Sequence, residues 1–307
     1  MRLPHMPGCY AAFHKQLGDL TLLEPALSRL RDFHGEPVRL FTRGGHAPLV
    51  ELMPGVRFTR PPVFLPTGDM YCFDPLSKSA FRSLTTPVWG RYLIIPERRE
   101  LQWFHPWIFA IPRSPELGDS YVAEFFWQHT PVPSTSPFRM PILSRPPDSW
   151  APGGVSSRSF ILVNATAGWR TKLWSPSGWA ETIRSLDGIS PVLLTSGGQD
   201  WQVRHCEEIV SLIGNGPRVL PTSLREFLWL CANARAVLTV DGSASHFAAA
   251  FGTPSLTLFG PTNSKNWHRP GPQRIAICAP VGGEQMASLR DFGPDPVIAA
   301  TRELSLA

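Results

Sequence analysis

One histidine stands at the head of an alanine-rich segment, directly after a short polar turn. Residues 239–263 run from an apolar stretch through Asp241-Gly242-Ser243-Ala244-Ser245 to His246 and then into alanines. A helix starting in this turn would offer free backbone N–H groups and a positive dipole end, which bind phosphate groups. In the alternative, Asp241 and Ser243 only cap the helix and His246 lies in the core. Taken alone, the local pattern favours this second interpretation.

Two further loops carry groups suited to similar chemistry. In residues 164–174, Lys172 could offset the charge of a diphosphate, and the neighbouring tryptophans could stack on a base. A solvated cation beside a core tryptophan is the more common arrangement. Asp19, in the turn Leu17-Gly18-Asp19, could accept a proton from a hydroxyl group. It could equally cap the helix that follows.

Strands and helices alternate along the second half of the chain. Ser175 and Pro176 start one predicted helix, and Ser223 with Glu226 forms the capping box of another. This alternation predicts right-handed βαβ units in a parallel sheet, where ligands bind outside the carboxyl ends of the strands. The predicted strands are residues 160–164, 191–195, 236–240 and 255–259.

The first half repeats the pattern less clearly. We predict a strand at residues 11–15, a turn at 17–19, a helix over Leu20 to Leu30 and a strand at 38–42. The fold class is therefore α/β, with two Rossmann-like doubly wound domains facing a central cleft. We place them at residues 1–150 and 151–307, joined by the Pro-, Gly- and Ser-rich segment 145–159. In one variant of this arrangement, the last helix packs back on the first domain.

Composition excludes several classes of protein. The net charge of +5 is spread without a basic run, which argues against a nucleic-acid-binding arm. It fits contact with anionic lipid or phosphorylated substrates, or it is incidental. Five scattered cysteines lack CxxC or metal-ligand spacing, which indicates reduced thiols and a cytoplasmic location. No secretory signal is recognisable, and no stretch approaches the ~18 apolar residues that cross a bilayer.

Short catalytic motifs of other nucleotide and hydrolytic enzymes are missing from the sequence. No GxGxxG follows the first predicted strand, no GxxxxGK[ST] is present and no GxSxG elbow occurs. These absences argue against dinucleotide-dependent dehydrogenases, P-loop hydrolases and α/β-hydrolases.

Four stretches together resemble glycosyltransferase family 9, the lipopolysaccharide heptosyltransferases, which have the two-domain GT-B fold. They are residues 17–31, 38–58, 161–186 and 223–263, and the last is the most specific. It contains the Asp-to-His turn, the alanine helix, Gly-Thr-Pro and Phe-Gly-Pro-Thr. Two departures stand out: Asp241-Gly242-Ser243 replaces the usual Asp-Thr/Ser-Gly order, and the loop carrying Lys172 is one residue longer.

The resemblance implies an inverting, metal-independent transfer of a sugar, most often heptose from ADP-heptose, to a hydroxyl of a lipopolysaccharide-core-like glycolipid. Asp19 would be the general base and Lys172 the cation opposite the departing diphosphate. No cofactor or nucleic acid is expected. The implied donor-binding residues are Asn164, Thr166, Lys172, Thr222, Asp241, Gly242, Ser243, Ser245 and His246.

The sequence says less about the acceptor and the cellular location than about the donor. Arginines pair with phosphates and aromatics stack on sugar rings, although tryptophans in residues 60–150 could equally be core. The acceptor-binding candidates are Gly18, Arg82, Arg98, Arg99 and Trp103. We expect a cytoplasmic protein, with peripheral contact at the inner membrane face as an option. Two alternatives stay open: a same-fold enzyme with another nucleotide sugar and a natural-product or protein acceptor, or a non-catalytic nucleotide-sugar binder.

Overall fold

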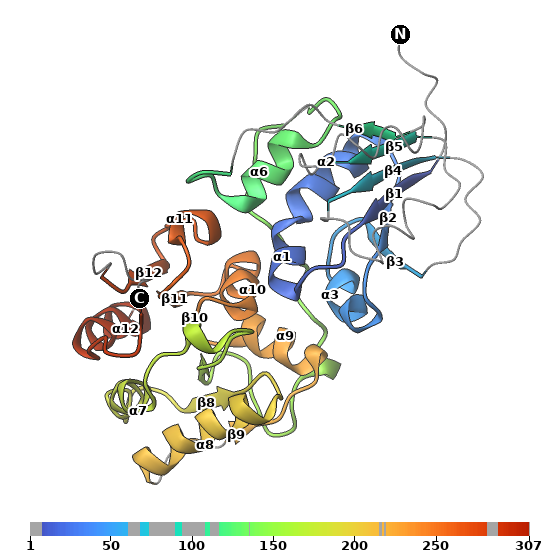
Figure 1. The fold of residues 1–307 in the computed structure, drawn as a ribbon. Coiled ribbons are helices and arrows are strands. Elements are labelled where there is room, and N and C mark those ends of the chain that lie inside the picture. The colour runs from blue at the N-terminus through green and yellow to red at the C-terminus, as the bar shows by residue number, and fades with distance from the viewer. Residues whose placement is uncertain are drawn as a thin grey trace. The chain divides into compact units, whose positions relative to one another are not determined.

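A computed structural model describes residues 8–60, 68–73, 90–93, 108–110, 117–134, 136–214, 217, 219–280 and 288–306. The chain divides into two compact units, Met1–Ser144 and Arg145–Ala307 (Figure 1). The boundary therefore falls at the start of the segment 145–159, and that segment belongs to the second unit. Each unit contains one parallel sheet.

The first unit is built on a six-stranded parallel sheet with the order β3-β2-β1-β4-β5-β6. The chain adds strands outward from β1, returns beside β1 with β4, and continues outward on the other side, as in doubly wound folds. Its elements are β1 Cys9–Ala12, α1 Leu17–Leu22, α2 Glu24–His34, β2 Val38–Phe41, η1 Gly44–His46, α3 Ala47–Glu51, β3 Val56–Thr59, β4 Asp69–Cys72, β5 Gly90–Leu93, β6 Ile108–Ala110 and α6 Val122–His129.

The start of this unit differs from the sequence prediction. The first strand is β1 rather than residues 11–15, because its buried apolar residues pair with both β2 and β4. Gly18 and Asp19 lie inside the first turn of α1 and not in a loop. Pro25 occupies the first turn of a second helix, α2, since it has no N–H to donate and is tolerated there. One predicted helix is thus two.

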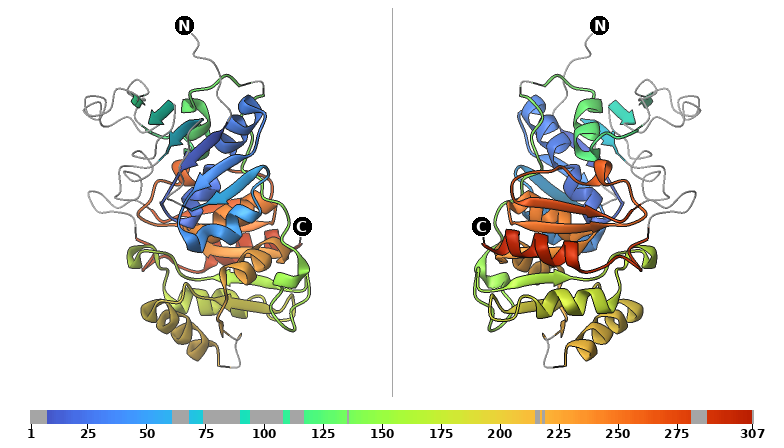
Figure 2. Two further views of the ribbon diagram at one scale, coloured as in Figure 1. Left: turned by 90° about the vertical axis from the view of Figure 1, so that its right-hand side faces the viewer. Right: turned by 90° about the vertical axis from the view of Figure 1, so that its left-hand side faces the viewer.

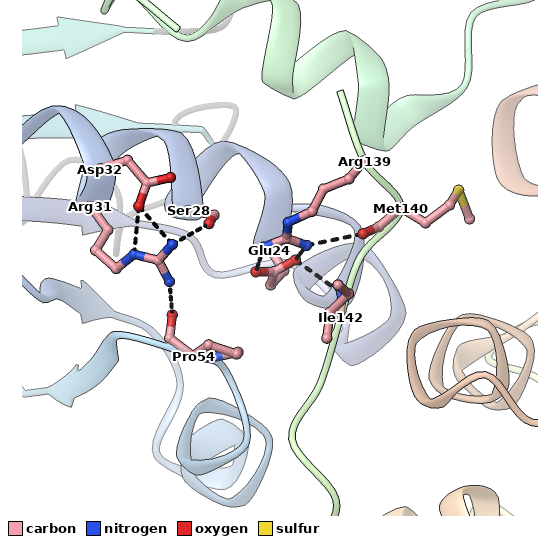
Figure 3. A network of polar contacts seen from close by, with 8 residues as sticks. All are labelled: Glu24, Ser28, Arg31, Asp32, Pro54, Arg139, Met140 and Ile142. Carbon is pink, nitrogen blue, oxygen red and sulfur yellow. Dashed lines mark hydrogen bonds and ion pairs between the residues drawn. The ribbon is translucent and has the colours of Figure 1, made fainter. Parts of the chain in front are cut away.

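A buried carboxylate fixes the end of the first unit to α2. Glu24 is fully buried, and its two oxygens accept from Arg139 Nη1 and Nη2, both at 2.7 Å (Figure 3). The same carboxylate accepts from the Ile142 N–H at 3.0 Å. Two turns further along α2, Arg31 donates to the Pro54 carbonyl at 3.1 Å. These bonds attach the segments around residues 140 and 54 to one helix.

The second unit repeats the topology with the order β12-β11-β10-β7-β8-β9, again all parallel. The predicted strands at 236–240 and 255–259 are confirmed, and those at 160–164 and 191–195 are each one residue shorter. Its elements are η2 Asp148–Trp150, β7 Ile161–Asn164, η3 Arg170–Lys172, α7 Pro176–Arg184, β8 Val192–Thr195, α8 Asp200–Ile213, β9 Val219–Leu220, α9 Leu224–Asn233, β10 Ala236–Val240, α10 Ser243–Phe251, β11 Ser255–Phe259, α11 Ser264–Trp267, β12 Arg274–Cys278 and α12 Asp295–Leu306.

Helix starts in the second unit follow the predicted capping residues. Ser175 accepts the Gly178 N–H at the head of α7, and Ser223 with Glu226 forms a reciprocal capping box on α9. Helix α12 lies along β10, β11 and β12 of the same unit (Figure 2). All five cysteines are free thiols, four buried and Cys278 exposed. Within the described ranges, no helix has the length and apolarity needed to cross a bilayer.

Candidate functional site

The connections that follow two neighbouring strands of the second sheet leave in opposite directions. Strand β7 leads outward to β8, while its other neighbour, β10, leads outward to β11. Because both strands are parallel, the loop after Asn164 and the turn after Val240 leave from the same edge of the sheet. Such a switch point is where doubly wound sheets bind ligands.

A short charged network bridges this switch point. Lys172 Nζ donates to Asp241 Oδ2 at 2.6 Å, and Thr262 Oγ1 donates to the same oxygen at 2.7 Å. The side chains of Lys172 and Asp241 are 16% and 3% exposed. The three residues come from the loops after β7, β10 and β11. The predicted candidates Lys172 and Asp241 are therefore brought together, and Asp241 is occupied by a tertiary ion pair.

Helix α10 begins directly beside this pair. Its N-cap is Gly242, in an extended conformation, and no side chain caps the helix. The interpretation that Asp241 and Ser243 cap it is therefore wrong: Asp241 bonds elsewhere and Ser243 is the first helical residue. Ser245 Oγ instead donates to the Gly242 carbonyl at 2.7 Å. The first-turn N–H groups of a nine-residue helix thus face the switch point with no side-chain cap.

His246 lies in the first turn of α10 and is buried. Burial lowers its pKa to about 4; Asp241 opposes this shift, while Lys172 and His268 add to it. The ring is therefore neutral at pH 7. It can donate a hydrogen bond to an anion, but the positive charge at this site belongs to Lys172.

Two other candidates brace the loop after β7 from the side of β8. Asn164 Nδ2 donates to Thr195 Oγ1 at 3.2 Å, and Thr166 Oγ1 accepts the Gly197 N–H at 3.2 Å. Both residues are buried. Thr222 follows β9, which is separated from β7 by β8, so it leaves the same edge of the parallel sheet two strands from β7.

Sequence reasoning missed two residues that hold the site together. Thr262 shares the Asp241 carboxylate with Lys172; it belongs to the Phe-Gly-Pro-Thr stretch, but no local pattern connects it to Asp241. Gln202 is buried and donates to the Ala167 carbonyl at 2.8 Å while accepting the Gln199 N–H at 3.0 Å. Its spacing from Gln199 matches a capping box, which was the available signal.

The tryptophans of the loop after β7 have opposite environments. Trp174 is buried, and its Nε1 donates to the Phe292 carbonyl at 2.8 Å. Trp169 is 63% exposed, and Lys172 Nζ lies 4.9 Å from the centre of its ring. Trp174 is therefore a core residue, whereas Trp169 stands at the surface of the site.

The matching edge of the first sheet carries Asp19, Gly18 and two histidines. Asp19 is half-buried in the first turn of α1, and Gly18 beside it is buried.

The two histidines are His14, after β1, and His46, after β2. His46 Nδ1 lies 2.9 Å from Thr42 Oγ1. Burial, Arg43 and His14 lower the pKa of His46 to about 4. Burial and Arg43 also lower the pKa of His14. The acceptor candidates Arg82, Arg98, Arg99 and Trp103 lie outside the described residues.

A cavity of about 190 Å³ lies elsewhere in the first unit, against α2 and residues 133–139. Its lining includes Arg29, Arg31, Arg139 and Trp127 and none of the candidate site residues.

In the part of the chain that is described, no group of three or more His, Cys, Asp or Glu side chains is arranged to hold a metal ion.

Two doubly wound sheets, one with a charged network at its switch point, define a two-domain GT-B protein. Solved structures agree. Escherichia coli ADP-heptose lipopolysaccharide heptosyltransferase II is 19% identical, with a TM-score of 0.78 over 97% of this chain and 98% of that one. Escherichia coli heptosyltransferase WaaC, solved with ADP, is 16% identical, with a TM-score of 0.76 over 96% and 99%. At these identities the likeness establishes the fold.

Sequence similarity then identifies the family. The model of glycosyltransferase family 9 (heptosyltransferase) matches residues 137–291, just over half of the chain, and the chain belongs to this family. Among curated proteins, lipopolysaccharide heptosyltransferase 1 of Salmonella typhimurium is 32% identical over 130 residues. That region is 41% of this chain and spans 39% of the relative's length.

Proposed function

We propose that the chain transfers heptose from ADP-heptose to a hydroxyl of a lipopolysaccharide-core-like glycolipid, with inversion and without a divalent metal. The observation that carries this proposal is the Lys172–Asp241–Thr262 network at the head of α10. The family match and the heptosyltransferase names of its relatives support the choice of sugar and acceptor. The solved relative with ADP supports the choice of nucleotide.

The donor diphosphate would lie against the uncapped start of α10. There the backbone N–H groups donate to phosphate oxygens, and the helix dipole favours their charge. Neutral His246 adds a hydrogen-bond donor beside them. Gly242 needs no left-handed backbone, and a Cβ there would meet the protein only at ordinary contact distances, from 3.7 Å to Ala167 Cβ. The missing side chain therefore leaves room for a ligand.

Lys172 would offset the charge that develops on the departing diphosphate. In the structure its ammonium is held by Asp241, so a bound phosphate would share or replace that contact. Thr262 donates to the same carboxylate oxygen and would keep Asp241 hydrogen-bonded when Lys172 turns to the ligand. A charge-assisted contact of this kind strengthens as the leaving group becomes more negative.

Asp19 would act on the acceptor. Its carboxylate takes the proton of the acceptor hydroxyl while that oxygen attacks the anomeric carbon. The bond from this carbon to the diphosphate oxygen breaks in the same displacement, so ADP leaves and the anomeric configuration inverts. Lys172 and the α10 N–H groups supply the positive field that a divalent cation would otherwise supply.

Binding and turnover assays on the full chain test this proposal. Thermal shifts are compared for ADP-heptose, ADP and UDP-, GDP- and dTDP-sugars; ADP-heptose and ADP should stabilise the protein most. Transfer from ADP-heptose should survive EDTA. A preference for another nucleotide would overturn the donor assignment, and a strict Mg²⁺ requirement would overturn the metal-free mechanism. Binding without transfer or donor hydrolysis would indicate a non-catalytic relative.

A further inference from the structure

One large aromatic side chain of the second unit is left in solvent. Trp169 is 63% exposed, whereas Trp174 and Trp179 on the same segment are buried in the core. An exposed indole loses the stabilisation that burial would give it. Its cation–π contact with Lys172 contributes little at an exposed site. The folded chain alone therefore gives no reason for a tryptophan at this position.

Its place in the fold does give a reason. The Lys172 ammonium lies 4.9 Å from the Trp169 ring centre and 2.6 Å from Asp241 Oδ2. The indole therefore stands beside the network at the switch point. The next residue, Arg170, turns instead to Trp201, at 5.3 Å from that ring centre. The loop thus presents one open aromatic surface next to the cation that would contact phosphate.

We propose that Trp169 stacks on the purine base of the bound nucleotide. This inference rests on the proposed function, because it assumes a nucleotide diphosphate at Lys172. A purine has a flat π face close in size to an indole, and base–aromatic stacking is a main source of affinity for nucleotides. A sugar ring can also pack on an indole, through its C–H groups, so the probes below are chosen to separate contact with the base from contact with the sugar.

Calorimetry on the full chain tests the stacking with three probes: ADP, ADP-heptose and pyrophosphate. Trp169→Ala should raise the Kd for ADP and for ADP-heptose by about fivefold or more. Pyrophosphate has no base, so its Kd should not change. Trp169→Phe keeps an aromatic face and should recover most of the affinity. Trp201→Phe is the matched control, because it alters the neighbouring cation–π pair and should leave all three values unchanged.

Tryptophan fluorescence gives an independent readout. ADP should quench the wild-type emission, and this quenching should be lost in Trp169→Phe and retained in Trp201→Phe. An unchanged ADP Kd in Trp169→Ala would overturn the inference. So would an equal loss for pyrophosphate, which would mean that the indole only positions Lys172, or a loss confined to ADP-heptose, which would mean that it contacts the sugar. Wild-type protein that binds no adenine nucleotide would instead refute the proposed donor.

Discussion

The two sheets share one strand order but differ at their switch points. In the second sheet, β7 and β10 are bridged by the Lys172–Asp241 ion pair, and helix α10 starts beside it. In the first sheet, the proposed base after β1 is the half-buried carboxylate Asp19, and the loop after β2 carries His46, whose pKa is lowered to about 4. The same topology thus carries the proposed anion-binding edge in one unit and the proposed base in the other. The residues at the edge, and not the strand order, determine the chemistry.

The strongest test of this contrast removes the base alone. Asp19→Asn should lower turnover by about 10²- to 10⁴-fold, because an amide cannot accept the acceptor proton. The Kd for ADP should stay within error of wild type, because Asp19 belongs to the first unit and the proposed donor residues to the second. Turnover is followed by ADP release and Kd by calorimetry. Unaltered turnover would remove Asp19 from the mechanism.

A second change separates folding of the first unit from chemistry in the second. Arg139→Ala leaves the buried Glu24 carboxylate without its ion-pair partner and should lower the free energy of unfolding by about 3 kcal/mol. Urea denaturation measures this, and ADP affinity should be unchanged. The pair Glu24→Leu with Arg139→Met removes both charges and should recover part of the loss. If Arg139→Ala leaves the free energy of unfolding unchanged, the Glu24–Arg139 ion pair of Figure 3 does not stabilise the unit.

A third change, at the switch point of the second sheet, should alter the affinity for ADP. Lys172→Ala removes a charged hydrogen-bond donor and should weaken ADP by about 2 kcal/mol, roughly thirtyfold in Kd. Arg170→Ala is the matched control, since that neighbouring cation packs on Trp201 and not on the network. Its effect on Kd should be below about twofold, because an exposed cation contributes little. Equal effects of the two substitutions would indicate a nonspecific charge effect.

The smallest expected effect is one that both units share. The pKa values of His46 and His246 are lowered to about 4, while an unfolded histidine titrates near 6.5. The unfolded chain therefore binds protons first as pH falls from about 6.5 to 4, so stability is present above this window and is lost within it. His46→Gln and His246→Gln should each flatten the fall in melting temperature between pH 7 and 5. An unchanged slope would place that ring in solvent.

The sequence predicts elements correctly where residues close in the chain determine them. Strands β10 and β11 are apolar runs bounded by turn residues, and the Ser175 and Ser223 caps contact residues three positions away. The boundaries of β1 failed, because its residues CYAA have no alternation and their limits depend on pairing with β2 and β4. The start of helix α1 differs from the prediction for a related reason, since Leu17-Gly18-Asp19 has the composition of a turn.

The site was predicted as separate loops and not as a network. Lys172 and Asp241 were both candidates, but they are 69 positions apart in the chain and only the sheet brings their atoms to 2.6 Å. Local capping rules predict that Asp241 caps α10, but in the structure its carboxylate accepts from Lys172 instead. Thr262, a further 21 positions along, had no local signal for the same reason.

The distribution of thiols has a practical consequence for following the second unit in solution. Burial raises the pKa values of Cys9, Cys206 and Cys231, which makes them poor nucleophiles, and Cys72 is buried as well. Cys278 is exposed, at the end of β12, with Ser264 Oγ 3.3 Å from its sulfur. A maleimide dye would therefore attach at one place in the unmodified chain. It would report events at the carboxyl edge of the second sheet without any engineered cysteine.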